Sequence, residues 1–405
     1  DIVGLDSAIL QNRKVWQASG HEEGFYDLMS ECQNCQKRFR VDELVEDETI
    51  QQIAEEHNIA EFKKLEKALK EKIQNIKCPV CGGKLSVPRA FNLMFKTWIG
   101  PVESDQTMIY LRPETAQGIF VNFKNIMQTQ RLKIPFGIAQ IGKSFRNEIT
   151  PKNYIFRIRE FEQAEIEYFV KPQKAQDWFK KWVKERFDWY LKLGLKKENL
   201  RQRVHRKDEL AHYAQSATDI EYKFPWGWGE IEGIANRTDF DLKAHQTASG
   251  KDLSVLDEKT GKKFLPYVIE PSLGFERVML AILVDSFEEV KKGREGAGEA
   301  EIVLHLPKKL APIKVAVFPL VKKLSKTAKE VFERIRDEVY PAFYDETGSI
   351  GRRYRRQDEI GTPYCITIDF ETLKDETVTV RNRETMKQER VKIKEIVDWL
   401  REKLV

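Results

Sequence analysis

The sequence predicts an α+β protein in which a domain built on an antiparallel sheet is followed by a smaller α/β domain. Residues 134–170 contain two strand-like stretches joined by a turn, which predicts a long hairpin in the first domain. Two cysteine pairs within residues 25–85 predict a module inserted into that domain. From residue 311 onward, apolar strand-like runs alternate with helical segments, as is typical of an α/β domain. A chain of 405 residues is long enough for two or three such units.

The composition is that of an ordinary globular protein, with 41% hydrophobic and 33% charged residues. No apolar run approaches the length needed to cross a bilayer, and no secretory signal opens the sequence. We therefore expect a cytoplasmic protein without a membrane partner. The net charge of +5 permits a nucleic-acid partner but does not by itself argue for one.

The predicted hairpin has one face suited to a core and one suited to chemistry. Pro151 and Asn153 favour a turn at residues 149–153 and resist strand continuation. Because side chains alternate between the faces of a strand, the second arm can be divided by parity. One face carries residues that can pack a core, namely Phe156, Ile158, Ala164, Ile166, Tyr168 and Val170. The other face carries Arg157, Arg159, Phe161, Gln163 and Glu165.

On the first arm, Ser144, Arg146 and Glu148 also share one face. Guanidinium groups, an aromatic ring and a carboxylate in a row suit a triphosphate, a purine ring and an ammonium group. The same residue types also fit a solvated sheet face with cross-strand ion pairs. The hairpin taken alone leaves both interpretations open.

Four of the five cysteines form two pairs, Cys32-x-x-Cys35 and Cys78-x-x-Cys81, and two glycines follow the second pair. Without an export signal, this spacing favours a metal over disulfides. Four thiolates suit tetrahedral Zn²⁺, and the glycines allow the tight turn that such sites use. The alternative is two reduced pairs that merely lie near each other.

Periodicity and chain breakers predict the other elements of the first domain. Residues 43–76 are rich in Glu, Lys and Gln without Gly or Pro, which predicts an exposed helical hairpin. Residues 111–120 predict a strand, a turn at Pro113 and a helix capped near Thr115. Later elements are an aromatic helix at 178–193, a strand on which Glu230 and Glu232 share a face, a strand at 264–270 that Pro271 breaks, and a buried helix from Gly274 onward.

Residues 291–300 are rich in Lys, Gly and Glu and predict a linker to the second domain. Strands are predicted there at 313–320, 364–369 and 378–380, and helices at 327–340 and 393–404. Cys365 lies in an apolar run and is interpreted as a small buried hydrophobe. Between these elements lies a basic run that contains Arg352, Arg353, Arg355 and Arg356.

Several motifs resemble those of one enzyme family. Phe-Arg-Asn-Glu at 145–148, followed by Arg-x-Arg-Glu-Phe at 157–161, resembles motif 2 of the class II aminoacyl-tRNA synthetases. Glu-Pro-Ser-Leu-Gly-Phe-Glu-Arg at 270–277 resembles their motif 3. Leu-Arg-Pro-Glu-Thr-Ala-Gln at 111–117 and Gly-Glu-Ile-Glu-Gly-Ile-Ala-Asn-Arg at 229–237 are similar to the dimeric type of glycyl-tRNA synthetase. The resemblance covers nearly the whole sequence.

This resemblance implies a class II antiparallel-sheet catalytic domain at 1–300, with a zinc-bearing insertion at 25–85, and an anticodon-binding α/β domain at 309–405. It also implies a homodimer that uses glycine and tRNA(Gly). The basic run at 352–356 would then grip RNA phosphates or stack on bases, although a solvated charge run is the alternative. Val-Trp-Gln-Ala-Ser-Gly-His at 15–21 follows motif 1 in the family, and His21 taken alone is more often structural than catalytic.

The implied reaction is the ATP-dependent, Mg²⁺-assisted formation of glycyl-adenylate and its transfer to the 3′ end of tRNA(Gly). The resemblance assigns catalysis to Arg146, Glu148 and Arg277, with Arg146 on the α-phosphate. Arg277 would cover the adenine, with Phe161 as the opposite wall of a ring sandwich. The remaining ATP-binding residues by this resemblance are Asn147, Phe156, Arg157, Ile158, Glu230, Ile231 and Gly274, with Glu230 a candidate Mg²⁺ ligand.

Glycine offers no side chain to grip, so recognition depends on its ammonium group and on excluding a methyl group. By resemblance the glycine-binding residues are Arg40, Glu114, Phe161, Glu165, Glu270 and Ser272. For Glu114, the alternative is a carboxylate that simply favours the N-terminus of a helix.

Three other functions are alternatives. A non-catalytic nucleic-acid-binding accessory protein on the same fold predicts loss of the arginines and carboxylates, yet the sequence retains Arg146, Glu148, Glu165, Glu270 and Arg277. An enzyme that loads an amino acid onto a carrier protein would not need the C-terminal domain. A nucleotide-binding regulator would not need an amino-acid pocket.

Overall fold

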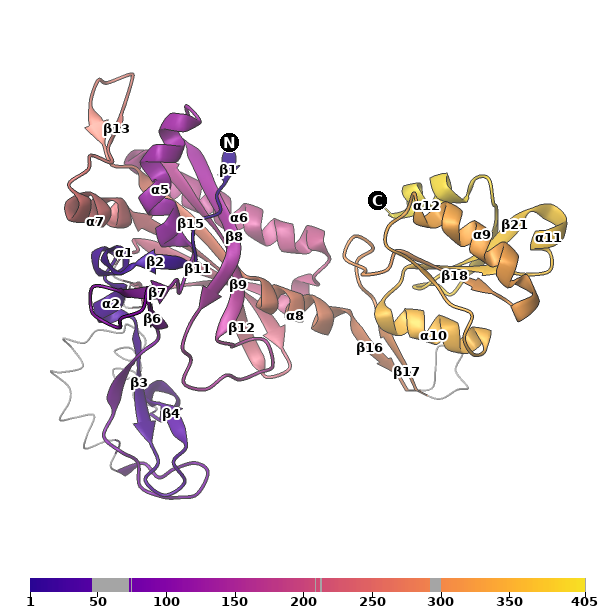
Figure 1. Cartoon of the computed structure of the whole chain (residues 1–405), viewed down its shortest axis with the longest axis horizontal. Coiled ribbons are helices and arrows are strands. Elements are labelled where there is room, and N and C mark those ends of the chain that lie inside the picture. Colours follow the sequence, from indigo (N-terminus) through magenta and orange to yellow (C-terminus); the bar gives the residue numbers. More distant parts are fainter. Residues whose placement is uncertain (46–72, 74, 208, 212, 292–299, 405) are drawn as a thin grey trace. The chain divides into compact units, whose positions relative to one another are not determined.

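The computed structural model describes residues 1–45, 73, 75–207, 209–211, 213–291 and 300–404. The chain divides into one unit formed by Asp1–Leu191 and Lys197–Leu280 and a second formed by Lys192–Lys196 and Ala281–Val405 (Figure 1). Most of the helical hairpin predicted at 43–76 and of the linker predicted at 291–300 lies outside the described residues.

A seven-stranded sheet forms the first unit, and its antiparallel character confirms the predicted fold class. Only the first edge strand pairs in parallel with its neighbour. The spatial order is β1 (Ile2–Gly4), β8 (Phe136–Phe145), β9 (Glu160–Val170), β15 (Tyr267–Gly274), β12 (Gly227–Thr238), β11 (Ser216–Phe224) and β10 (Leu200–Val204).

Helices cover both faces of this sheet because alternate residues of β9 point to opposite sides. Phe169 packs with α5 (Ala116–Thr129) and with Leu242 of α7 (Phe240–Ser249) in an apolar core. Tyr168, the preceding residue, contacts Trp178 and Trp182 of α6 (Ala175–Leu193). The side chains at odd positions of β9 therefore share their face of the sheet with α5 and α7.

The second arm of the hairpin becomes a strand later than predicted. The ladder between β8 and β9 ends at the pair Phe145 and Glu160, and residues 146–159 form a wide loop. Asn153 and Tyr154 both have positive φ, which turns the chain tightly inside this loop. The assignment of Phe156 and Ile158 to a core-facing strand was therefore wrong, because both residues lie in the loop.

Pro271 does not break its strand, contrary to the prediction. β15 continues to Gly274, and Pro271 pairs with Ile234 of β12. On its other side, β15 pairs with β9 through Ile269 and then again through Ser272, so the ladder skips the position where proline lacks an N–H donor. The strand keeps its register and carries both Glu270 and Ser272 to the same region.

Glu230 and Glu232 do not share a face, because β12 contains a β-bulge. Ile220 pairs with Glu232, whereas the next residue of β11, Glu221, pairs with Glu230, so Ile231 is an extra residue. A one-residue insertion reverses the alternation of side chains. Glu230 is exposed, whereas Glu232 is buried and bonded by Arg186 of α6 at 2.6 and 3.1 Å.

Among the described residues, two three-stranded sheets and the two-stranded sheet of β13 (Val255–Leu256) and β14 (Lys263–Phe264) complete the first unit. One contains β4 (Arg38–Arg40), β3 (Tyr26–Glu31) and β5 (Arg89–Asn92), and packs the cysteine-bearing segments around Leu28 and Leu85. The other contains β2 (Leu10–Asn12), β7 (Met108–Leu111) and β6 (Lys96–Trp98). The short helices α1 (Arg13–Ala18) and α2 (His21–Gly24) follow β2. Further short elements are η1 (Val41–Glu43), η2 (Pro172–Lys174) and η3 (Lys197–Asn199).

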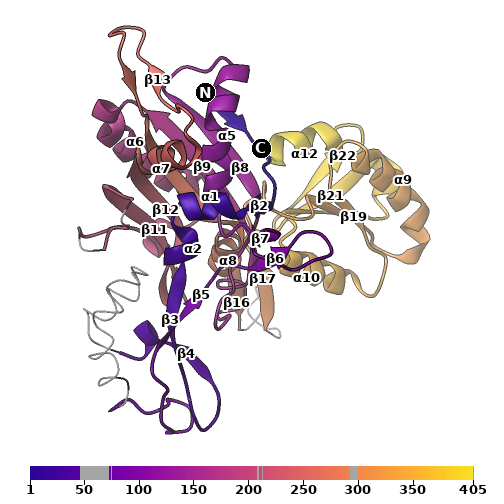
Figure 2. The ribbon, with the colours of Figure 1, turned by 60° about the vertical axis from the view of Figure 1, so that its left-hand side comes forward.

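The second unit is an α/β domain, as predicted. Its sheet has the order β19 (Ala342–Tyr344), β18 (Val315–Pro319), β20 (Tyr364–Ile368), β21 (Thr377–Asn382) and β22 (Gln388–Lys392). Figure 2 shows α9 (Ser325–Arg336) and α12 (Ile396–Leu404) on one side of this sheet and α10 (Ile350–Ile360) on the other. Cys365 is buried against α10, in agreement with the prediction.

The remaining elements of the second unit are a hairpin of β16 (Phe287–Val290) and β17 (Glu301–Leu304), with η4 (Lys322–Leu324) and α11 (Thr372–Asp375). Among the described residues, we find no helix with the length and apolar content that a bilayer crossing requires.

Candidate active site

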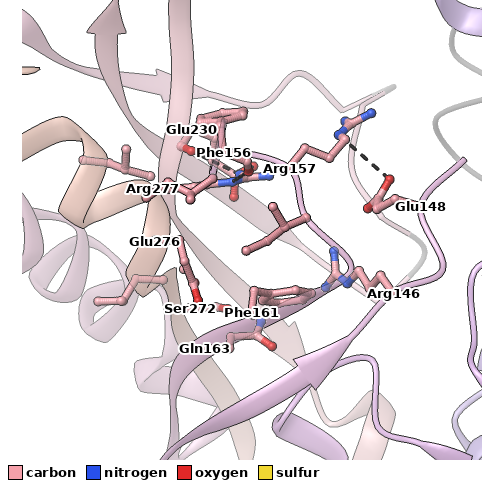
Figure 3. Close-up of a pocket in the computed structure, with 15 residues that line it drawn as sticks. Arg146, Glu148, Phe156, Arg157, Phe161, Gln163, Glu230, Ser272, Glu276 and Arg277 are labelled. Carbon is pink, nitrogen blue, oxygen red and sulfur yellow. Dashed lines mark hydrogen bonds and ion pairs between the residues drawn. The ribbon is translucent and has the colours of Figure 1, made fainter. Parts of the chain in front are cut away.

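A cavity of about 160 Å³ opens between the loop after β8, the strands β9, β12 and β15, and the start of α8 (Phe275–Ser286) (Figure 3). The structure brings most of the predicted nucleotide residues together there. Those that line it are Arg146, Glu148, Phe156, Arg157, Ile158, Phe161, Glu230, Ile231, Gly274 and Arg277, and they are joined by Ser272 of the predicted glycine site. Asn147 does not line the cavity; its backbone N–H donates to Leu93 O at 2.7 Å.

Arg146 is held by two aromatic rings and a backbone carbonyl. Its guanidinium carbon lies 5.3 Å from the ring centroid of Phe25 and 5.4 Å from that of Phe161. Its Nε donates to Pro113 O at 3.1 Å. These contacts fix a permanent positive charge at the cavity wall, where it can meet an anionic group.

Arg277 lies in the first turn of α8 and faces the loop. Its Nε donates to Phe156 O at 3.2 Å, and its Nη1 donates to the backbone O and Oε2 of Glu230 at 3.1 and 3.2 Å. The guanidinium carbon lies 4.4 Å from the Phe156 ring centroid. Figure 3 shows these three residues grouped together, whereas Phe161 lies beside Arg146. In this structure, the ring that contacts Arg277 is therefore Phe156.

Charged side chains hold the two ends of the loop together and connect it to η1. Arg157 Nε lies 3.9 Å from Glu148 Oε2, and Arg159 Nε donates to Glu148 O at 3.1 Å. Lys152 forms a hydrogen bond with Glu43 of η1. This loop carries six of the predicted nucleotide residues, and these contacts hold it at its base and near its tip.

Four lining residues were not among the predicted site residues, namely Ile155, Gln163, Leu273 and Glu276, and the two polar ones join neighbouring elements. Glu276 accepts hydrogen bonds from the backbone N–H of Glu162 at 2.9 and 3.0 Å, which joins α8 to β9. Gln163 donates to Glu165 Oε1 at 2.6 Å and to Ser272 Oγ at 3.0 Å. Glu276 lies inside the motif at 270–277, whereas Gln163 lies just after the motif at 157–161, on the hairpin face that carries Phe161 and Glu165; these positions were the sequence signals for the two residues.

Glu165 is a buried carboxylate on β9 that residues of two other elements hold. The backbone N–H and Oγ1 of Thr115 donate to its Oε2 at 2.8 and 2.5 Å, and Ser272 Oγ donates to its Oε1 at 2.8 Å. Thr115 is the N-cap residue of α5, as predicted, but its hydroxyl bonds Glu165 rather than the helix. Since Ser272 also lines the cavity, Glu165 lies directly behind the cavity wall.

Glu270 is held by Arg237, a buried residue of β12 that was not among the predicted site residues. Arg237 Nη1 donates to both carboxylate oxygens of Glu270 at 3.1 and 3.0 Å. Its Nε and Nη2 donate to Asp241 of α7 at 2.8 and 2.9 Å. Arg237 is the last residue of the family motif at 229–237, so this motif was the sequence signal that could have identified it as a site residue.

Glu114 belongs to the same network. Gln117 Nε2 donates to Glu114 Oε1 at 3.0 Å and to Asp241 Oδ1 at 2.9 Å. His21 Nε2 lies 3.3 Å from Glu114 Oε2. The structure thus links Glu114, through Gln117, Asp241 and Arg237, to Glu270. We call Glu114, Glu165, Glu270, Arg237 and Asp241 the acidic pocket.

Burial and neighbouring charges give these carboxyl groups different proton affinities. Burial raises the pKa of Glu270 to about 8, although Arg237 opposes that change. Burial and the nearby Glu114 raise the pKa of Glu165. Burial also acts on Glu114, but His21, Arg237 and Gln117 outweigh it and lower the pKa of Glu114. A surplus of acidic groups around one arginine suits a small cation.

Arg40, which was predicted to bind glycine, is not among the residues that line the cavity. It belongs to β4 in the cysteine-bearing region, and its Nη1 lies 3.2 Å from Asp27 Oδ2.

The four paired cysteines converge, as predicted. Their sulfur atoms all lie within 4.8 Å of one another. The backbone N–H groups of Cys35 and Asn34 donate to Cys32 Sγ at 3.5 and 3.4 Å and lower the pKa of the Cys32 thiol to about 6. A Cβ at Gly83 would lie 3.1 and 3.2 Å from two of the sulfurs, so only glycine leaves the cradle open. These features fit a tetrahedral Zn²⁺ bound by thiolates.

The four arginines of the basic run lie in α10, where one is buried and three are exposed. Arg353 is buried and donates to Gly348 O at 2.7 Å and to Pro319 O. Among the exposed arginines, Arg356 lies 2.6 Å from Asp345 and Arg355 lies 3.5 Å from Glu301. Arg352 is the third exposed arginine.

Comparison with known proteins gives the family. The class II tRNA synthetase core domain (G, H, P, S and T) matches residues 100–286, and the anticodon binding domain matches residues 314–403. The glycine–tRNA ligase of Caldanaerobacter subterraneus subsp. tengcongensis is 53% identical over 403 residues, which cover 99% of this chain and 86% of that protein. Those of Clostridium acetobutylicum and Clostridium beijerinckii are 55% and 54% identical, with the same coverage. The chain therefore belongs to the glycine–tRNA ligase family of class II aminoacyl-tRNA synthetases.

Proposed function

We propose that this protein activates glycine with ATP and transfers the glycyl group to the 3′-terminal ribose of tRNA(Gly). One observation carries the assignment of the site. Ser272 lines the arginine-bearing cavity and at the same time donates a hydrogen bond to Glu165 of the acidic pocket. A nucleotide in the cavity and an ammonium group in the pocket would therefore be neighbours, as the first step requires.

In that first step, a carboxylate oxygen of glycine attacks the α-phosphorus of ATP, and pyrophosphate leaves. No protein nucleophile is needed, so catalysis consists of alignment and charge stabilisation. We assign Arg146 to the α-phosphate, because its charge is held at the cavity wall by Phe25, Phe161 and Pro113. Asn147, next to Arg146 and bonded to Leu93 O, is assigned to the nucleotide by the family motif alone.

We assign Arg277 to the adenine and the γ-phosphate, with the adenine entering between Arg277 and Phe161. In the structure the Arg277 guanidinium lies over the ring of Phe156, and because the group is planar, its other face is the one we assign to the adenine. Glu148 and Arg157 hold the loop that closes the site, while Ile158, Ile231 and Gly274 line it. Mg²⁺, when bound, would neutralise phosphate charge, and the exposed carboxylate of Glu230 is the ligand we assign.

We assign the ammonium group of glycine to Glu114, Glu165 and Glu270, with Ser272 and Phe161 at the entrance. Support comes from the convergence of these carboxylates and from their burial, which strengthens their interaction with a cation. Because hydrogen bonds fix Glu165 on both of its oxygens, the pocket has little freedom to enlarge for a methyl group. Arg40, whose Nη1 lies 3.2 Å from Asp27 Oδ2, is assigned to glycine by the family motif alone.

ATP–pyrophosphate exchange tests this proposal directly. Exchange should depend on glycine and should be at least about tenfold slower with alanine, since excluding one methyl group is worth roughly a factor of ten or more. The Glu165→Gln variant should lose glycine-dependent exchange but keep its fold. Equal rates with glycine and alanine would reject the assignment, and no exchange with any amino acid would favour a non-catalytic accessory protein.

Three further assignments accompany the activity. Cys32, Cys35, Cys78 and Cys81 would hold a structural Zn²⁺, which the sulfur cluster and the Gly83 cradle support. Residues 1–300 and 309–405 would be the catalytic and anticodon-binding domains, and two copies would form a homodimer as in the dimeric type that the sequence resembles. In α10, the exposed Arg352 is the residue we assign first to RNA phosphate, ahead of Arg355 and Arg356, which are paired.

A further inference from the structure

The short segment around α2 contacts both halves of the proposed site. His21, the first residue of α2, faces Glu114 of the acidic pocket. Phe25, the residue after α2, faces Arg146 at the wall of the cavity. Neither residue lines the cavity, and each lies against a residue that we assign to a substrate.

Both ring nitrogens of His21 have a side-chain partner. Nδ1 lies 2.8 Å from Ser19 Oγ, and Ser19 Oγ lies 3.3 Å from Trp16 O. Nε2 lies 3.3 Å from Glu114 Oε2. One nitrogen of the ring is thus held by the residues just before α2, and the other faces the carboxylate of Glu114.

His21 leaves Glu114 little freedom of rotation. The imidazole ring is itself fixed, with Trp16 edge-on at 5.3 Å and Phe25 at 5.5 Å between ring centroids. One carboxylate oxygen of Glu114 meets His21, and the other meets Gln117. Removing His21 would leave one oxygen of Glu114 without this donor, close to Glu165 and Glu270.

Phe25 plays the corresponding role for Arg146. Its ring contacts the guanidinium at 5.3 Å, while Phe161 contacts it at 5.4 Å. The carbonyl that accepts from Arg146 belongs to Pro113, the residue next to Glu114. A displacement of α2 would therefore reach Arg146 through Phe25 and Glu114 through His21.

We propose that His21 and Phe25 are positioning residues of this enzyme, which act through Glu114 and Arg146, so that one short segment orients the groups for both substrates. This proposal rests on the roles proposed above for Glu114 and Arg146. It predicts that the two residues affect different kinetic constants even though they are four positions apart.

The test is steady-state ATP–pyrophosphate exchange on the whole chain with the variants His21→Gln and Phe25→Leu. His21→Gln should raise the KM for glycine about tenfold or more, with the KM for ATP within about twofold, because one charge-assisted hydrogen bond to Glu114 is lost. Phe25→Leu should lower kcat about tenfold with the KM for glycine nearly unchanged, because Arg146 acts on the α-phosphate in the transition state. Glu23→Gln, an exposed change on the same helix, is the matched control and should leave all constants unchanged.

A double-mutant cycle separates this proposal from the roles on which it rests. Glu114→Gln alone must raise the KM for glycine; if it does not, the assigned role of Glu114 is wrong. If it does, adding His21→Gln to that variant should have almost no further effect, since His21 acts through Glu114. Equal effects of His21→Gln in both backgrounds, or equal changes of every constant by both α2 variants, would overturn the proposal. Should His21→Gln not fold, as judged by its melting temperature, His21→Asn takes its place in the same cycle.

Discussion

Arg237 Nη1 donates hydrogen bonds to both carboxylate oxygens of Glu270, at 3.1 and 3.0 Å, while its other two nitrogens bond Asp241. All three side chains are buried. A single guanidinium thus compensates two carboxylates from different elements, β15 and α7, at the floor of the acidic pocket. Several consequences of this arrangement can be measured.

Replacing Arg237 should destabilise the first unit strongly. Arg237→Gln leaves two buried carboxylates without their cation, which costs about 3–5 kcal/mol in the free energy of unfolding. Arg203→Gln is the control, because Arg203 is partly exposed beside Asp219 and its loss should cost less than about 1 kcal/mol. Urea titrations followed by circular dichroism measure both. Equal losses for the two variants would contradict the compensating role of Arg237.

The affinity for glycine should rise with pH. Burial raises the pKa of Glu270 to about 8, so a growing fraction of this group ionises as the pH rises toward that value. The ionised form attracts an ammonium group more strongly, and the KM for glycine should therefore fall from about pH 6 to about pH 8 and then level off. Exchange assays at saturating ATP provide the measurement. Glu270→Gln should bind glycine more weakly and lose this slope, and a slope that persists in the variant would assign it to another group.

Metal removal should affect the cysteine-bearing region more than the large sheet. We expect about one Zn²⁺ per chain by elemental analysis, and a lower melting temperature after chelation. Gly83→Ala should weaken metal retention, because its Cβ would lie 3.1–3.2 Å from two sulfurs. Gly351→Ala, where nothing lies within 4 Å of the added carbon, is the control. A purified protein that is metal-free yet equally stable would refute the zinc assignment.

Arg352 and Arg353 are adjacent in sequence but should behave differently when replaced. Arg352 is exposed, so Arg352→Gln should weaken tRNA binding about twofold to fivefold and lower the salt dependence by about one phosphate contact. Arg353 is buried on two backbone carbonyls, so Arg353→Gln should instead cost about 1–3 kcal/mol of stability. Filter binding at several salt concentrations and thermal unfolding distinguish the two effects. If the two variants showed the same tRNA affinity and the same stability, the assignment of Arg352 to RNA and of Arg353 to the core would be rejected.

Local sequence patterns were sufficient to predict most of the helices and strands. The alternation of residues in the hairpin and the βα pattern after residue 311 predicted an antiparallel sheet and an α/β domain, and both are present. Such patterns fail where one residue changes the local geometry. The bulge at Ile231 placed Glu230 and Glu232 on opposite faces, and the turn at Asn153 and Tyr154 kept Phe156 out of the sheet. Neither feature has a period that a sequence reveals.

The sequence by itself determined the chemical groups of this site, because Arg146, Arg277, Glu165 and Glu270 stand in motifs whose residue types suit phosphates and an ammonium group. Only the tertiary structure decided how these groups are held. Arg237 and His21 became visible as partners of Glu270 and Glu114 once strands and helices distant in sequence had packed together. The physical reason is that a side chain's type follows from the chain locally, whereas its charge state and orientation depend on burial and on partners that only the fold assembles.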